Sequence, residues 1–141
     1  MEKKVLLTIV STQKLMEEPP EETRLVTDGT LRATEDGIEL SYAETVLTGL
    51  VGTKTTFYVQ SDRVTLQRSG KVQSKMIFVV GQEDRSLYDM GFGALMISIF
   101  TQKLHSSLTE NGGRLVVGYR ISIEDEVSGT IEYQIEARLK E

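Results

Sequence analysis

A carboxylate and a guanidinium are the side chains of this sequence that best fit a shared site. In the segment 38–44, apolar residues fall on alternate positions as far as Tyr42, and Glu44 continues their parity. In the segment 64–68, the same alternation ends at Arg68. Alternate residues of a strand point to one face, so both charges are predicted to project inward. A buried arginine needs a partner, and a carboxylate is the best one available.

The pair has three interpretations that the sequence leaves open. As a polar anchor in a lumen, Glu44 and Arg68 would orient an anionic or hydrogen-bonding ligand, with Tyr42 beside them on the same inward parity. As a purely structural ion pair, they would only satisfy one another. As residues at strand ends, they would reach solvent, because alternation commonly breaks there. No catalytic residue and no metal ligand is assigned.

His105 is the only histidine, and acid–base catalysis is the chemistry that a lone histidine suggests. A triad with Ser106 or Ser107 would need an orienting carboxylate, and no local signature supplies one. No second histidine and no cysteine is present to share a metal. His105 shares its parity with Thr101 and Lys103, which predicts an exposed strand position. We therefore expect no enzyme activity.

Three segments resemble phosphate, dinucleotide or calcium sites, but their residues do not have the spacing that these sites require. The segment 49–55 lacks the glycine spacing and the Gly-Lys step of a phosphate loop. The segment 91–93 lacks the third glycine and the following helix of a dinucleotide-binding turn. Three carboxylates at 124–126 lack the spaced ligands of a calcium loop. The absence of cysteine excludes thiolate zinc and iron–sulfur sites, so no cofactor is expected.

Charge and hydropathy narrow the range of partners. Sixteen Lys and Arg against twenty-one Asp and Glu give a net charge of −5, which disfavours a nucleic-acid partner. No apolar run is long enough to span a bilayer, and the run 5–10 is too short and too polar for a signal peptide. A chain without cysteine fits a reducing cytoplasm, where we expect the protein. Its oligomeric state stays open.

Alternation with a period of two predicts antiparallel strands that have one packed face and one wet face. It is clearest at residues 115–123 and 131–139, and a turn is predicted between them at Ser128-Gly129. One side of these two strands should be buried and the other wet. The predicted inward residues are Val117, Tyr119, Ile121, Ile131, Tyr133 and Ile135, and the predicted wet ones are Arg120, Glu132 and Glu136.

Turn chemistry divides the rest of the chain into short strands. A first strand is expected over roughly 4–14, followed by an exposed loop in the acidic proline segment 17–22. Asp-Gly at 36–37 predicts a hairpin. No segment has helical spacing over three turns, although 85–92 and 103–109 could each hold a single helical turn. About eight to ten strands in 141 residues predict one all-β domain, 1–141. We favour a closed, antiparallel, up-and-down β-barrel, which hides the sheet edges.

Short motifs through the centre of the chain carry a family resemblance. They are Tyr42-x-Glu44, Arg68-x-Gly70, Phe78-x-x-Gly81, Tyr88, Gly93, Thr101, Gly113 and Tyr119. In this pattern the chain resembles the YwiB-like family of small bacterial proteins over nearly its whole length. The resemblance implies a calycin-like (lipocalin-type) β-barrel and no particular reaction. One departure is Met90-Gly91, where that family tends to show Thr-Pro after the tyrosine.

Two hypotheses of function follow. In the first, the barrel binds a small apolar or amphipathic molecule, and Glu44, Arg68, Tyr42, Tyr88 and Tyr119 form the ligand site. In the second, methionine and phenylalanine side chains fill the barrel, and the protein acts as a structural or protein-interaction module. The volume of the lumen discriminates between them, because about 300 Å³ or more favours a ligand.

Overall fold

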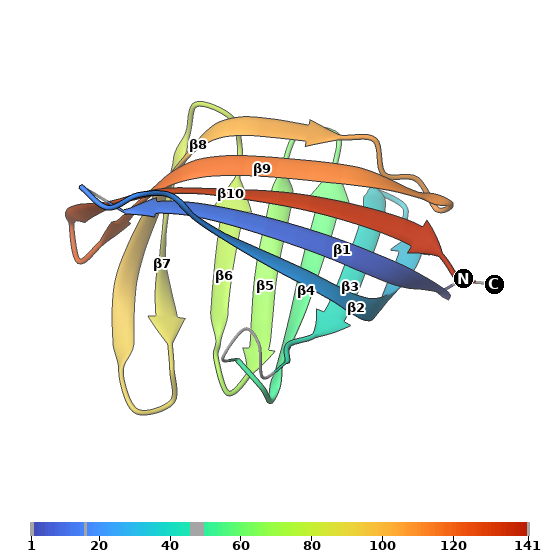
Figure 1. Ribbon diagram of the computed structural model, residues 1–141, viewed down its shortest axis with the longest axis horizontal. Helices are drawn as coiled ribbons and strands as arrows, with labels where there is room; N and C mark the ends of the chain where they lie inside the picture. Colours follow the sequence, from blue (N-terminus) through green and yellow to red (C-terminus); the bar gives the residue numbers. More distant parts are fainter. Residues whose placement is uncertain (1, 16, 46–49, 141) are drawn as a thin grey trace.

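The computed structural model describes residues 2–15, 17–45 and 50–140, and all its regular secondary structure in those ranges is β-strand (Figure 1). The strands are β1 (Glu2–Leu15), β2 (Glu21–Ala33), β3 (Gly37–Ala43), β4 (Thr53–Gln60), β5 (Val64–Gly70), β6 (Ser74–Phe78), β7 (Glu83–Asp89), β8 (Ala94–Ser106), β9 (Gly112–Ile123) and β10 (Glu126–Leu139).

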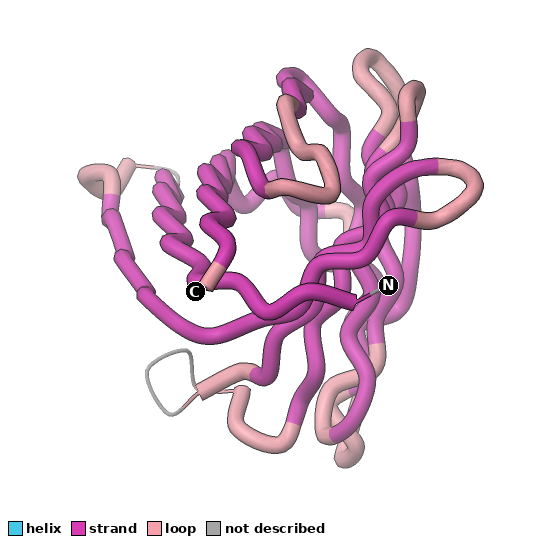
Figure 2. The backbone as a smooth tube through the Cα atoms, turned by 90° about the vertical axis from the view of Figure 1, so that its right-hand side faces the viewer, coloured by secondary structure: helices cyan, strands magenta, loops and turns pink. Residues whose placement is uncertain are grey.

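All ten strands belong to one sheet in the order β6-β5-β4-β3-β2-β1-β10-β9-β8-β7. Strands that follow one another in the chain pair as antiparallel hairpins, except β6 and β7, which are the two edges of the sheet, and β1 pairs with β10 to join the two halves. In that ladder Val5 lies opposite Leu139, and Ile9 lies opposite Ile135. The strands encircle one axis (Figure 2). The up-and-down barrel predicted from the alternation is confirmed.

The barrel is closed only partly, because its edge strands β6 and β7 meet without a continuous ladder. Two isolated bridges link the described residues around this junction: Gln73 with Asp89, and Val80 with Thr101. Between them, the Asp84 carboxylate accepts a hydrogen bond of 3.0 Å from the backbone N–H of Ile77. A side chain thus satisfies a donor on an edge strand. We call this junction the β6–β7 seam.

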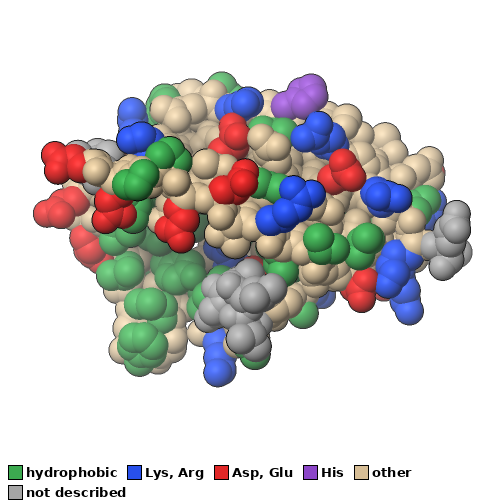
Figure 3. Space-filling model, viewed as in Figure 1, with side chains coloured by type: hydrophobic (Ala, Val, Ile, Leu, Met, Phe, Trp, Pro, Cys, Tyr) green, Lys and Arg blue, Asp and Glu red, His purple; other side chains and the backbone are tan. Residues whose placement is uncertain are grey.

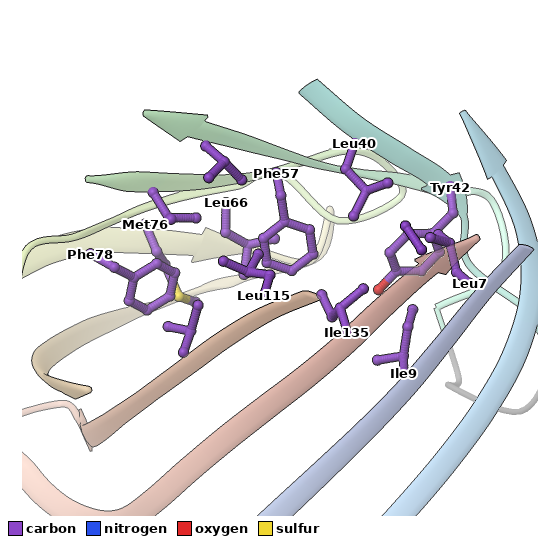
Figure 4. Close-up of a cluster of buried hydrophobic side chains, with 14 of the residues drawn as sticks. Leu7, Ile9, Leu40, Tyr42, Phe57, Leu66, Met76, Phe78, Leu115 and Ile135 are labelled. Atoms are coloured by element: carbon purple, nitrogen blue, oxygen red, sulfur yellow. The ribbon is translucent and has the colours of Figure 1, made fainter. Parts of the chain in front are cut away.

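The predicted inward face fills most of the barrel interior (Figure 4). On β9 and β10, Val117, Tyr119, Ile121 and Ile135 are buried, while Ile131 and Tyr133 are half-buried. Arg120 and Glu136 are exposed as predicted, and Glu132 is half-buried because it pairs with Lys103 on the outer surface. The largest fully buried side chains are Phe57, Phe78, Leu7, Leu31, Leu40 and Leu66. The face assignment is therefore confirmed.

The turn between β9 and β10 lies at Glu124-Asp125, not at the predicted Ser128-Gly129. Both turn residues have left-handed φ angles, 51° and 66°, as a two-residue type I′ turn requires. Gly129 instead lies at a bulge within β10, with a φ of 146°. A Cβ on this residue would lie 2.1 Å from the carbonyl oxygen of Lys14 on β1. Glycine is required there for close strand approach rather than for the turn.

Strand structure also extends further than predicted in three places. Neither 85–92 nor 103–109 contains a helical turn, because their first parts continue β7 and β8. The acidic segment 17–22 is shorter as a loop than predicted, since β2 already begins at Glu21, opposite Gln13 of β1. The sequence of β2 hides this pairing because Leu25 is the only buried residue in its first nine positions. The partner strand, not the local pattern, sets its register.

Ile121 provides a test of the face assignment. We predict that Ile121→Ala lowers the free energy of unfolding by about 2–5 kcal/mol, because buried apolar contacts are lost and a cavity remains. Glu136→Ala, at an exposed position of β10, is the control and should change stability by no more than about 0.5 kcal/mol. Urea denaturation measures both variants. Equal stabilities would mean that the two faces are assigned the wrong way round.

The role of Asp84 in the β6–β7 seam can be tested at the backbone amide of Ile77. In Asp84→Ala the N–H of Ile77 loses its acceptor, so its hydrogen exchange should accelerate by about tenfold, the scale of one net hydrogen bond. Residue-resolved exchange followed by NMR measures this rate. The neighbouring exposed carboxylate gives the control, Glu83→Ala, for which no change is expected. An unchanged rate at Ile77 in Asp84→Ala would show that the carboxylate does not hold the seam.

Candidate functional site

Glu44 and Arg68 both project into the barrel, as their parity predicts. Arg68 belongs to β5, and Glu44 directly follows β3. The backbone N–H of Glu44 donates to the carbonyl of Thr53 at 2.9 Å, which extends the strand pairing by one residue and fixes the carboxylate inward. The side chain of Glu44 is 2% exposed and that of Arg68 is 9% exposed. Two opposite charges are therefore buried together.

Strand register places a third polar side chain between them. Thr55 on β4 lies opposite Tyr42 of β3 on one side and opposite Arg68 of β5 on the other. Its side chain is fully buried, and its hydroxyl donates a hydrogen bond of 2.5 Å to Glu44 Oε2. Cross-strand neighbours on one face lie within contact distance, so a polar row crosses three strands of a mainly apolar interior.

The two charges form an ion pair but no direct hydrogen bond. Arg68 Nε lies 3.8 Å from Glu44 Oε2, which is beyond hydrogen-bonding distance. The guanidinium reaches across the barrel instead, where Nη2 donates to the hydroxyl of Tyr133 on β10 at 3.5 Å. The sequence predicts that the two side chains meet in the interior, directly or through one water. They do lie together there as an ion pair, at 3.8 Å and without a direct hydrogen bond.

Part of the hydrogen-bonding capacity of this pair is unused. Glu44 Oε1 and Arg68 Nε are both buried, and no described residue bonds either atom. Proteins rarely leave buried charged groups incompletely bonded, since each such group costs about 1–3 kcal/mol or more. One acceptor and one donor of the buried pair are therefore unpaired among the described residues.

Two buried tyrosines near the pair, Tyr42 and Tyr119, have raised pKa values. Burial, together with the charge of Glu44, raises the pKa of Tyr42 above its ordinary range. Burial and the neighbouring Tyr133 likewise raise the pKa of Tyr119. Burial lowers the pKa of Arg68, but the neighbouring Tyr133 and Tyr119 raise it by more, so the pKa is raised overall. At neutral pH the phenols of Tyr42 and Tyr119 are thus neutral, and Arg68 is a cation.

A cavity of about 210 Å³ lies against the ion pair, and we call it the pair cavity. Its lining residues are Ile9, Ser11, Thr23, Leu25, Tyr42, Glu44, Leu50, Arg68 and Tyr133. Its 210 Å³ is less than the about 300 Å³ set above as the volume favouring a ligand. The middle of the barrel is packed with side chains, so the interior is neither open throughout nor filled throughout.

A second cavity, of about 260 Å³, lies at the end of the β6–β7 seam, and we call it the seam cavity. Its lining is mostly apolar and comprises Leu50, Val51, Lys71, Val72, Tyr88, Met90 and Phe92. Leu50 lines both cavities, which makes them neighbours. Phe92 is 89% exposed, and hydrophobic side chains gather over the β7–β8 hairpin at the lower left of Figure 3.

The structure brings four of the five candidate ligand residues to these cavities. Tyr42, Glu44 and Arg68 line the pair cavity, and Tyr88 lines the seam cavity. Tyr119 lines neither cavity; it is buried behind Tyr133, with ring centroids 6.4 Å apart. Its contact with a ligand stays a prediction.

Two site residues were not identified from the sequence. Tyr133 was assigned only to the core, although its hydroxyl gives a signal, since a buried phenol needs a partner. Nothing in the sequence marked Thr55 as a site residue, because threonine is common in β-strands.

Met90-Gly91, where the sequence departs from the family pattern, forms the tip of the β7–β8 hairpin. The Met90 N–H donates to the carbonyl of Gly93 at 2.9 Å, and Asp89 Oδ1 accepts from the Gly91 N–H at 2.8 Å. The φ of Gly91 is 90°, a conformation that favours glycine. The departure therefore shapes one wall of the seam cavity.

His105 lies away from these cavities. Its side chain is exposed on β8, as predicted, and appears in purple on the outer surface in Figure 3. Within residues 2–15, 17–45 and 50–140, no cluster of three or more His, Asp or Glu side chains could hold a metal ion. The same residues include no helix long and apolar enough to cross a membrane.

Comparisons with known proteins agree on one relationship. A family model described as "Domain of unknown function (DUF1934)" matches residues 7–135. The "Uncharacterized beta-barrel protein YwiB" of Bacillus subtilis (strain 168) is 33% identical over 100 residues, covering 71% of this chain and 69% of the relative. The crystal structure of the ywiB protein from Bacillus subtilis matches with a TM-score of 0.87 at 25% identity, covering 99% of this chain and 94% of that one.

The ion pair can be tested by a double-mutant cycle. Glu44→Leu and Arg68→Met should each lower the free energy of unfolding by about 3–5 kcal/mol, because each strands the other charge in the interior. The double variant should cost much less than the sum of the two, since no charge then remains buried. Denaturant titration of all four proteins gives the coupling. A coupling of about 0–1 kcal/mol would identify the pair as equivalent to a surface salt bridge.

Proposed function

This chain belongs to the family described as a domain of unknown function (DUF1934), and we propose that it binds a small, partly apolar molecule in the pair cavity of its barrel. The resemblance to YwiB-like proteins that the sequence motifs indicate is confirmed. The names of the family and of the relative specify no ligand, so the proposal rests on the geometry of the site.

The observation that carries the proposal is a buried ion pair whose two residues line a cavity and each keep an unused hydrogen-bonding atom. A buried pair is a poor means of stabilising a fold, because apolar residues of similar volume are often as stable or more so. The incomplete bonding of Glu44 and Arg68 makes this cost larger. Both atoms lie in residues that a molecule in the pair cavity would touch. We therefore assign the pair to ligand binding rather than to stability.

The shape of the two cavities suggests a molecule with a polar end and an apolar body. The polar end fits beside Glu44 and Arg68, where Tyr42 and Tyr133 add phenolic hydroxyls. The apolar body would extend past Leu50 toward the seam cavity and its largely apolar lining. Each cavity alone is smaller than the about 300–1,000 Å³ of a drug-sized site, so a ligand longer than one ring would use both.

We propose binding without catalysis. His105 lies on the outer surface of β8, and the pair cavity contains no nucleophile held by a general base. The absence of cysteine is the reason to place this function in the cytoplasm.

The alternative is a protein-interaction module acting through the outer surface. The exposed apolar side chains of Leu87 and Phe92 on and beside β7 favour it. The two functions differ in where a partner contacts the molecule, and that difference can be measured.

A thermal-shift screen of a metabolite library separates them. Under the binding proposal, at least one compound should stabilise the wild type by about 2.7 kcal/mol at one hundred times its Kd. Thr23→Trp, which places an indole at the pair cavity, should abolish the shift, whereas His105→Ala on the outer surface should keep it within about twofold in affinity. A screen without any stabilising compound, or a shift retained in Thr23→Trp, would contradict binding in this cavity.

A further inference from the structure

We propose that the ligand of the pair cavity is uncharged and presents a hydrogen-bond donor and acceptor side by side, as the edge of a lactam or cyclic imide does. Its acceptor would take a hydrogen bond from Arg68, and its N–H would donate to Glu44. This inference rests on the proposed binding function and names the chemical class of the molecule.

The charge of the site selects against ions. Among the residues that line the pair cavity, Glu44 and Arg68 carry the formal charges, one negative and one positive. An anionic ligand would be attracted by Arg68 but repelled by the Glu44 carboxylate, because Oε2 of Glu44 lies only 3.8 Å from Nε of Arg68. A cationic ligand would be attracted by Glu44 but repelled by Arg68. Either ion would leave a net charge in a desolvated interior, whereas a neutral ligand keeps the site balanced.

The unused atoms define the ligand's polar edge. Arg68 Nε is a donor without an acceptor, and Glu44 Oε1 is an acceptor without a donor. A ligand that satisfies both must offer an acceptor and a donor at once. A carboxylate offers only acceptors and an ammonium offers only donors, but a cis-amide edge offers one of each.

The pair is loose enough to open toward the cavity. Nε and Oε1 are both buried, so a ligand reaches them only if the side chains turn. No direct hydrogen bond joins Glu44 and Arg68, and the hydrogen bond from Arg68 to Tyr133 is long, at 3.5 Å. Among the hydrogen bonds of the described residues, turning the guanidinium therefore breaks only the long one to Tyr133. Thr55 holds Oε2 of the Glu44 carboxylate, which leaves Oε1 as the oxygen that turns toward a ligand.

The remaining walls fit the flat body of a small ring. Ile9, Leu25 and Leu50 supply the apolar part of the lining. Tyr42 and Tyr133 keep their phenolic rings against the same space, and the pKa of Tyr42 is raised, so its hydroxyl stays neutral. A volume of about 210 Å³ suits a single ring better than a chain.

Four probes of matched size test the ligand class on the full chain at pH 7: ε-caprolactam, N-methylcaprolactam, cyclohexanecarboxylate and cyclohexylammonium. Binding is followed by NMR chemical shifts of residues lining the pair cavity. We expect ε-caprolactam to bind most tightly. N-methylcaprolactam lacks the N–H and should bind about tenfold more weakly, the scale of one buried unsatisfied group. The two ions should bind more weakly still.

A variant narrows the expected difference between the lactam and the anion. Glu44→Gln removes the negative charge and leaves Arg68 uncompensated, so cyclohexanecarboxylate should gain about tenfold in affinity relative to the lactam. The matched control is Glu132→Gln, which removes the carboxylate of an outer-surface pair with Lys103 at 3.1 Å. Its probe ranking should equal that of the wild type. The wild-type ranking decides the inference even if Glu44→Gln fails to fold.

The outcomes separate the two levels of the proposal. If an ion binds the wild type as tightly as ε-caprolactam at the pair cavity, the ligand class is wrong and binding in the cavity stands. If N-methylcaprolactam equals ε-caprolactam, donation to Glu44 is wrong. If none of the four probes shifts a resonance of the cavity residues, while the library screen also yields no stabilising compound, both the ligand class and the binding function are overturned.

Discussion

The ladder between β1 and β10 is the interaction on which the rest of this barrel depends. It runs from Val5 opposite Leu139 to Leu15 opposite Gly129 and joins two halves of a meander that would otherwise be an open sheet. The same ladder places Ser11 opposite Tyr133, and both residues line the pair cavity. Because of this closure, the hydroxyl of Tyr133 reaches Arg68 from the opposite wall. The site therefore exists only in the closed barrel.

The polar row inside the barrel has an energetic cost that the apolar interior must offset. Glu44, Thr55 and Arg68 lie in a core that is mainly hydrophobic, and the two charges are incompletely hydrogen-bonded. Packing of residues such as Phe57 and Leu66 supplies the compensating stability, since fully burying one such side chain contributes about 1.5–3 kcal/mol. A strained or costly feature that persists in a well-packed core is typical of a functional site.

The sequence predicted the architecture and the direction of the key side chains because both follow from alternation. Glu44 and Arg68 lie inside for the same reason that Val117 and Ile135 do. Turn position was less predictable: Glu124-Asp125 forms a type I′ turn without glycine, while Gly129 meets a requirement for close packing against β1. The seam could not be predicted, because which edges remain unpaired depends on how many strands fit around the axis. Tyr133 was missed because its partner lies 65 positions away in the chain.

The strand order has a consequence for how the chain reaches its fold. Read from β7 to β10 and then from β1 to β6, the sheet follows the sequence with a single join, between β10 and β1. Residues 140 and 4 are hydrogen-bonded at that join, so their backbones are adjacent. In a circular permutant linked there and opened between β6 and β7, every continuous ladder would be a hairpin, and only the contacts across the β6–β7 seam would join distant segments. The long β1–β10 ladder would become local, so contact order predicts that such a chain folds faster than the natural connectivity.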